Sequence, residues 1–113
     1  MNVLTLTGRL VSEPVRRDTV KGVVCEFRLA ADSRPRLWID VQTWGALAGR
    51  AAQHLTSGRQ VAVNGTLICE EYHTRAGDKA SRWFCRATTI TFLDRPTPVA
   101  DDVERQPAAA GVS

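Results

Sequence analysis

Two of the three tryptophans in this chain of 113 residues fall on the polar side of one predicted strand. Residues 36–44 alternate with a period of two, as a half-buried strand does, and Trp38 and Trp44 share one face with Asp40 and Gln42. Indole rings on such a face are free to stack on flat ligands, and a stack on a nucleic-acid base contributes roughly 1 to 3 kcal/mol. Six residues of strand separate the two rings by about 20 Å, so they would serve two different ligand rings.

Arginine suggests a second kind of contact. Of the 15 basic residues 13 are arginine, and the net charge is +3. Guanidinium groups pair with phosphate in a bidentate manner and stack on flat rings, so this balance permits a polyanionic partner. GC-rich coding, which also enriches arginine, remains an open explanation of part of the bias. The basic residues predicted to follow such a partner are Arg9, Arg16, Arg17, Arg34, Arg36, Arg59, Arg75, Lys79, Arg82 and Arg86.

The remaining reactive side chains form no catalytic or metal-binding motif. His54 and His73 have no carboxylate or cysteine partner at a meaningful spacing, and the chain has no phosphate-cradling glycine loop or nucleophile elbow. We therefore predict a binding protein without enzymatic activity, metal or cofactor. Cys25, Cys69 and Cys85 are predicted to be free buried thiols, although their odd number leaves open a disulfide between subunits.

Five predicted strands and one short helix must position these side chains. Leu47, Ala51 and Leu55 recur at four-residue spacing, which indicates a helix within residues 45–57. Gly8 lies inside the first strand and indicates a bulge or a point of close approach. An all-β, five-stranded Greek-key barrel with a helix between strands three and four is the plan of the OB-fold. The strands are predicted over residues 3–11, 23–31, 36–44, 60–72 and 81–92.

The composition changes after residue 93. Residues 1–93 are predicted to form one domain, and residues 94–113, rich in proline, alanine and small polar side chains, a disordered tail. No apolar run approaches the roughly 18 residues of a membrane span. The N-terminus begins directly with a strand pattern, unlike a signal peptide. These features favour a cytoplasmic protein with no membrane partner.

Several stretches resemble the bacterial single-stranded DNA-binding (SSB) proteins. Residues 2–17 resemble the opening of that family, and residues 24–31 resemble its second strand. The strongest match is residues 38–65, with a tryptophan opening strand three, an aromatic residue before glycine, a helix ending in leucine, and the later Gly-Arg-Gln-Val and Val-Asn-Gly. Tyr72 and Arg82-Trp83 follow at the right spacing, so the resemblance covers about residues 2 to 93.

The resemblance implies a nucleoid-associated homotetramer, a dimer of dimers, that wraps single-stranded DNA in replication, recombination, repair or DNA uptake. It makes Tyr72 a third stacking platform beside Trp38 and Trp44, and Trp83 a fourth. Core packing remains open for Trp83, which alternates with Cys85 and Ala87. Edge-to-edge pairing of subunits through the first strand would cover an open sheet edge. The residues implied in that pairing are Val3, Leu4, Thr5, Leu6 and Thr7.

The sequence departs from the family at three places near the expected DNA path. The connection at residues 32–35 is short where the family has a long hairpin, and Asp40 stands where the family tends to have a base. Cys69-Glu70-Glu71 precedes Tyr72 where the family is basic. Since carboxylates repel phosphates, we expect weaker binding, a shorter occluded site or altered wrapping.

The end of the chain also differs from the family pattern. Residues 106–113 lack the acidic, hydrophobic tip through which the family recruits other proteins. If Ser113 is the true end, recruitment is reduced or absent, as in an accessory paralogue or a plasmid or phage member.

Two alternatives remain open from the sequence. One is a dimeric OB-fold of the replication-restart (primosomal) kind, which also binds single strands. The other is an OB-fold adaptor between proteins, with its aromatic side chains buried in an interface. Quenching of tryptophan fluorescence by oligo(dT) separates the adaptor from the two DNA-binding proteins.

Overall fold

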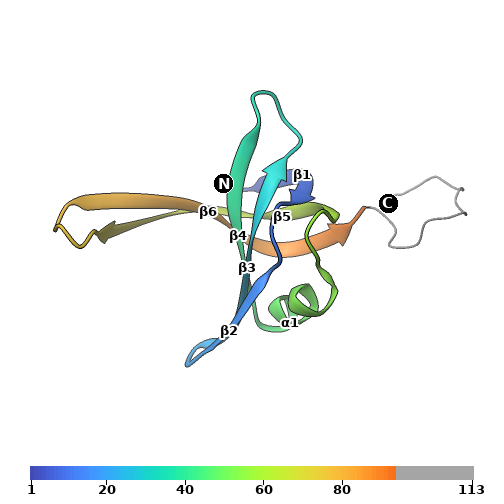
Figure 1. Ribbon diagram of the computed structural model, residues 1–113, viewed down its shortest axis with the longest axis horizontal. Coiled ribbons are helices and arrows are strands. Elements are labelled where there is room, and N and C mark those ends of the chain that lie inside the picture. The colour runs from blue at the N-terminus through green and yellow to red at the C-terminus, as the bar shows by residue number, and fades with distance from the viewer. Residues whose placement is uncertain (94–113) are drawn as a thin grey trace, which may run out of the picture.

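A computed structural model describes residues 1–93 of the protein (Figure 1). The predicted tail over residues 94–113, with its missing acidic tip, lies outside the described residues. The described part consists of six strands and one helix. In chain order these are β1 (Leu4–Leu10), β2 (Val15–Thr19), β3 (Gly22–Ala31), β4 (Leu37–Trp44), α1 (Gly45–His54), β5 (Gln60–His73) and β6 (Lys79–Phe92).

The strands form one sheet that closes on itself. Their order is β1-β5-β6-β4-β3-β2, and β1 pairs a second time, with β3, which closes the barrel. Among the described strands β4 and β6 run parallel, and the other neighbours are antiparallel. The predicted all-β barrel is confirmed, with its helix at the predicted place in the sequence.

The count of six strands instead of five comes from β2. Gly8, Arg9 and Leu10 of β1 pair with one edge of β3, and β2 pairs with the same edge further along. Glu13-Pro14 separates the two, because proline has no amide hydrogen to donate to the ladder. The two short strands together therefore act as one interrupted strand of the barrel.

The core lies inside the barrel and under α1. Ala48, Ala51 and Leu55 join the buried cluster of strand side chains, so the four-residue spacing is confirmed as the packed side of the helix. Gly8 is confirmed as a point of close approach: a Cβ atom there would lie 2.2 Å from the carbonyl oxygen of Ala30. The absence of a side chain at Gly8 lets β1 pass close to β3 and close the barrel.

Strands β5 and β6 extend well beyond the barrel. They pair from Val61 opposite Phe92 to His73 opposite Lys79, and their distal residues are mostly exposed. Figure 1 shows this hairpin projecting from one side of the barrel. We call residues 69–83 the arm; it carries Tyr72 and Trp83.

Candidate nucleic-acid interface

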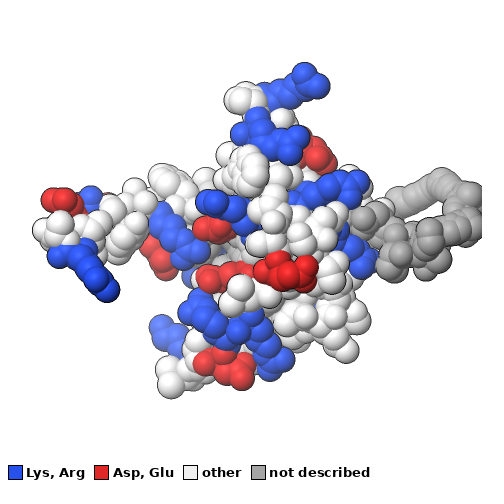
Figure 2. Space-filling model, viewed as in Figure 1, with Lys and Arg blue, Asp and Glu red and all other residues white. Residues whose placement is uncertain are grey.

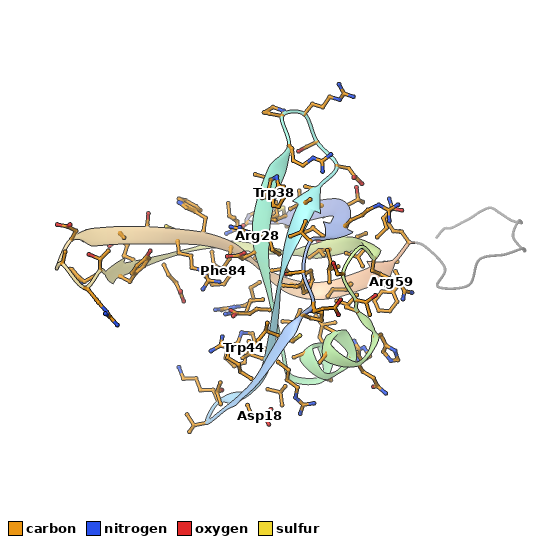
Figure 3. All side chains as sticks on the ribbon, in the orientation of Figure 1. Asp18, Arg28, Trp38, Trp44, Arg59 and Phe84 are labelled. Carbon is orange, nitrogen blue, oxygen red and sulfur yellow. The ribbon has the colours of Figure 1, made fainter. Side chains whose placement is uncertain are left out.

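The side of β3, β4 and β6 that faces away from the core collects most of the candidate side chains. Strand pairing places Arg28 opposite Asp40, and it places Phe84 beside Asp40 on the other neighbouring strand. Paired residues project to the same side of a sheet, so the register determines which side chains meet. We call this side the outer face. Figure 3 shows Trp38, Arg28, Phe84 and Trp44 in succession along it.

Trp38 lies open on the outer face. Its residue surface is 52% exposed, and its neighbour across the β3–β4 ladder is the small Ala30. Its place on the polar side of the strand is therefore confirmed, and core packing does not account for it. An exposed indole beside a small residue leaves its ring free for stacking.

Trp44 is held more tightly than the alternation predicts. It is half-buried at the end of β4, where Gly45, with φ +63°, turns the chain directly into α1. Its indole N–H donates to Oε1 of Gln42 at 2.7 Å, which fixes the orientation of the ring. Trp44 also lines a shallow hollow together with Lys21 and Arg86. A base stacked there would lie near two cations.

Gln42 occupies the centre of the outer face. The alternation places it on this side, but it is only 8% exposed because charged side chains surround it. Its Oε1 accepts from Trp44 and, at 3.3 Å, from Nε of Arg86, while its Nε2 donates to Glu26 at 3.1 Å. Each end of the amide is therefore used, and Gln42 connects an aromatic platform to the charged groups.

Two carboxylates and three arginines form a network beside Gln42. Glu26 pairs with Arg17 at 2.8 Å and with Arg82 at 3.7 Å. Asp40 pairs with Arg28 at 3.3 Å and with Arg82 at 3.6 Å. We call these five side chains the carboxylate network. The face in view in Figure 2 accordingly carries acidic groups set among basic ones.

The network keeps Glu26 ionised. Burial alone would raise its pKa, but hydrogen bonds from Gln42 and Arg17 and the charges of Arg17 and Arg82 outweigh burial and hold the pKa below its usual value. Arg82 in turn lies over the ring of Phe84, with 4.8 Å from the guanidinium carbon to the ring centroid. Phe84 is fully buried and forms a flat support beneath that cation.

The arm places its two aromatic residues on opposite sides. Tyr72 pairs across from Ala80 and shares the side of Arg82 and the outer face, and it is 49% exposed. Trp83 follows Arg82 in the strand and therefore projects to the opposite side of the arm, across from Cys69. Its surface is 59% exposed, because the arm extends beyond the barrel at this point. The core packing left open for Trp83 is wrong. A path along the outer face meets Trp38, Trp44 and Tyr72 but not Trp83.

The predicted basic residues are only partly brought together. Arg17, Arg82 and Arg86 lie with the tryptophans on the outer face, where Arg28 and Lys21 join them. Sequence reasoning missed these last two. The alternation of residues 23–31 puts Arg28 on the outward side, so the sequence could have predicted its exposure. Its pairing with Asp40 depends on the register between β3 and β4.

The other predicted bases have different surroundings. Arg9 donates to the carbonyl of Gly58 at 2.9 Å. The guanidinium carbon of Arg59 lies 4.7 Å from the ring centroid of Phe92, beside α1. Arg16 pairs with Asp18, and Lys79 with Glu71 on the side of the arm that carries Trp83. The remaining three occupy exposed connections between strands; they are Arg34, Arg36 and Arg75.

Within residues 1–93 no three His, Cys, Asp or Glu side chains gather as metal ligands would. The one helix of this part of the chain is too short and too polar to cross a membrane.

The cysteines divide by exposure. Cys25 and Cys85 are fully buried, as predicted, and burial raises the pKa of both thiols; for Cys25 the charge of Glu26 adds to that rise. The prediction of a buried thiol is wrong for Cys69, which lies exposed on the arm. Burial inside the barrel keeps Cys25 and Cys85 from the surface. A disulfide between subunits therefore stays a prediction for Cys69.

We expect one thiol of the folded, reduced protein to react rapidly with 5,5′-dithiobis(2-nitrobenzoate), because Cys69 is exposed, whereas burial shields Cys25 and Cys85 and raises the pKa of their thiols. All three should react after unfolding in guanidinium chloride. The variant Cys69→Ser should remove the fast phase. A second fast equivalent in the folded protein would contradict the burial of Cys25 and Cys85.

Comparison with known proteins gives one consistent result. The single-strand binding protein family model matches residues 1–93. A single-stranded DNA-binding protein of Thermotoga maritima is 32% identical over 93% of this chain and 83% of its own length. A second, from Corynebacterium glutamicum, is 32% identical over 92% of this chain, which spans only 51% of that protein. The small single-stranded DNA-binding protein of Streptomyces coelicolor has a similar structure, with a TM-score of 0.67 and 25% identity over 80% of this chain and 92% of its own.

Proposed function

This chain belongs to the single-strand binding protein family, and from that premise we propose that it binds single-stranded DNA without sequence preference. The observation that carries the proposal is the open indole of Trp38 on the same outer face as Arg28 and Arg82. Stacking does not depend on the identity of the base, since every base has a π-face. The role is therefore binding and protection of the strand, without catalysis.

Each class of side chain has a separate task in this proposal. Trp38, Trp44 and Tyr72 supply stacking surfaces along one side of the barrel and arm. Arginines between them contact phosphates, which contributes affinity that falls as salt rises. Gln42 keeps the Trp44 ring in one orientation, so that less ordering is needed when a base arrives. Trp83, on the other side of the arm, meets DNA only where a strand crosses over the arm.

We infer that the active form is a homotetramer built through β1. Residues 4–7 pair with β5 on one edge, whereas pairing with β3 begins only at Gly8. Among the described residues the second edge of this segment has no partner strand, apart from the Thr7 carbonyl that accepts from Asp32. An open edge of this kind favours pairing with the same segment of another subunit. Val3 to Thr7 remain the proposed contacts.

The cellular role follows from the DNA partner. We propose a cytoplasmic, nucleoid-associated protein that acts where single strands arise, in replication, recombination, repair or DNA uptake. The three departures from the family sequence near the expected DNA path still predict weaker binding, a shorter occluded site or altered wrapping. An occluded site of full family length at both low and high salt would contradict it.

Titration of the full chain with oligo(dT) tests the proposal. We expect strong quenching of tryptophan fluorescence, because bases stack on indole rings, and an observed association constant that falls steeply with salt. Mass in solution, measured on the same samples, distinguishes a tetramer from a replication-restart dimer. Unchanged fluorescence at low salt, with oligo(dT) in large excess, would instead favour the protein adaptor.

A further inference from the structure

Three of the arginines on the outer face already have anionic partners within the chain. Arg17, Arg28 and Arg82 each lie within 4 Å of a carboxylate of the network. A DNA phosphate that reaches these groups must either add to an existing pair or replace a carboxylate. The geometry of the individual pairs indicates which of them can exchange.

Arg82 makes the weakest and most divided contacts of the network. Its Nη2 lies 3.7 Å from Glu26 and 3.6 Å from Asp40, longer than a good hydrogen bond to either. Its side chain is 38% exposed, and Phe84 supports it from below. The cation is thus held in place without being fully satisfied, which is the condition for accepting a further anion.

The two carboxylates differ in how firmly they are bound. Glu26 is the more buried and accepts hydrogen bonds from Arg17 at 2.8 Å and from Gln42 at 3.1 Å. Asp40 contacts Arg28 and Arg82 at longer distances and is the more exposed of the two. Glu26 is therefore the fixed anchor of the network, and Asp40 is the group that a phosphate can displace.

We propose that Asp40 is an internal substitute for phosphate: it holds Arg82 over Phe84 in the free protein and is replaced there by a DNA phosphate on binding. This inference rests on the proposed function and adds to it a residue that sets affinity. Asp40 positions the arginine and at the same time competes with DNA for it. Loss of the negative charge should therefore strengthen binding and add a phosphate contact.

The variant Asp40→Asn tests the competition, since it removes the charge and nearly keeps the shape. We expect about two- to fivefold tighter binding of oligo(dT) at low salt. This is the gain expected when a phosphate no longer has to break an exposed ion pair in order to reach the arginine. The plot of log association constant against log salt should become steeper by about 0.7, the contribution of one extra phosphate on a single strand. Fluorescence anisotropy of labelled oligo(dT) over a range of salt gives both quantities.

Asp18→Asn is the matched control. Asp18 also pairs with an arginine, Arg16, at 3.3 Å, and its removal changes the net charge equally. It lies on β2 outside the carboxylate network, so its salt slope should equal that of the unchanged protein. Equal gains in both variants would reduce the effect to overall charge and overturn the inference.

A second pair of variants separates competition from a merely structural role. Arg82→Gln alone should weaken oligo(dT) binding. Combined with Asp40→Asn, it should abolish the gain in affinity that Asp40→Asn produces by itself. A gain that persists without Arg82 would overturn the exchange. If Asp40→Asn unfolds, as shown by urea denaturation, Asp40→Ala takes its place. If the unchanged protein binds oligo(dT) but neither Asp40→Asn nor Arg82→Gln alters that binding, this inference is refuted and the proposed function stands.

Discussion

Replacing Trp38 by alanine is expected to weaken oligo(dT) binding by about 5- to 150-fold, the loss of one base stack worth roughly 1 to 3 kcal/mol. The ring is half open to solvent and its neighbour across the ladder is the small Ala30, so the substitution removes a binding surface without leaving a cavity in the barrel. Stability in urea should stay within about 0.5 kcal/mol of the unchanged protein. Anisotropy of labelled oligo(dT) measures the affinity without relying on the missing fluorophore.

Trp83→Ala is the matched control for Trp38→Ala. Its indole is exposed to a similar extent, but it lies on the other side of the arm from Tyr72. We expect a clearly smaller loss of affinity for short oligonucleotides that cover one subunit. Equal losses would show that the strand contacts both sides of the arm. An unchanged affinity in Trp38→Ala would remove the outer face as the binding surface.

Trp44→Ala is a less direct test of stacking. The indole N–H of Trp44 is bonded to Gln42, whose other contacts reach Arg86 and Glu26. Removing the ring therefore disturbs a buried amide as well as a platform, and the affinity loss combines the two effects. Trp38 is the cleaner site.

Gly8→Ala is expected to destabilise the fold by about 3 kcal/mol or more, at or above the upper end of ordinary overpacking. The new Cβ would lie 2.2 Å from the Ala30 carbonyl oxygen and 2.9 Å from the Ala31 Cα. These are backbone atoms of the strand that closes the barrel, so no side chain can rotate to make room. Urea denaturation followed by tryptophan fluorescence measures the change in the free energy of unfolding.

The control for that substitution is Gly49→Ala in α1. Apart from its chain neighbours and the backbone of its own helix, a Cβ at Gly49 would meet no heavy atom within 4 Å, and alanine favours a helix over glycine. We expect this variant to be more stable than the unchanged protein by about 0.4 to 1 kcal/mol. Unchanged stability in Gly8→Ala would mean that β1 and β3 do not approach closely in solution.

Local patterns predicted much of the fold. Alternation identified the five predicted strands to within two residues at every end, and the spacing of Leu47, Ala51 and Leu55 identified the helix. These patterns depend on the geometry of a few consecutive residues, which a sequence records directly. The alternation did not clearly separate β2 from β1, because the extent of β2 is set by its pairing with β3 and not by its own sequence pattern.

The candidate site divides in the same way. The sequence by itself determined that Trp38 and Trp44 share a face with Asp40, because neighbouring side chains of a strand point to alternate sides. Only the tertiary structure decided that Gln42 is buried, that Asp40 meets Arg28 and Arg82, and that Trp83 is exposed. Partners and exposure depend on register between strands far apart in the chain, and on how far a strand runs beyond the barrel. No local periodicity carries that information.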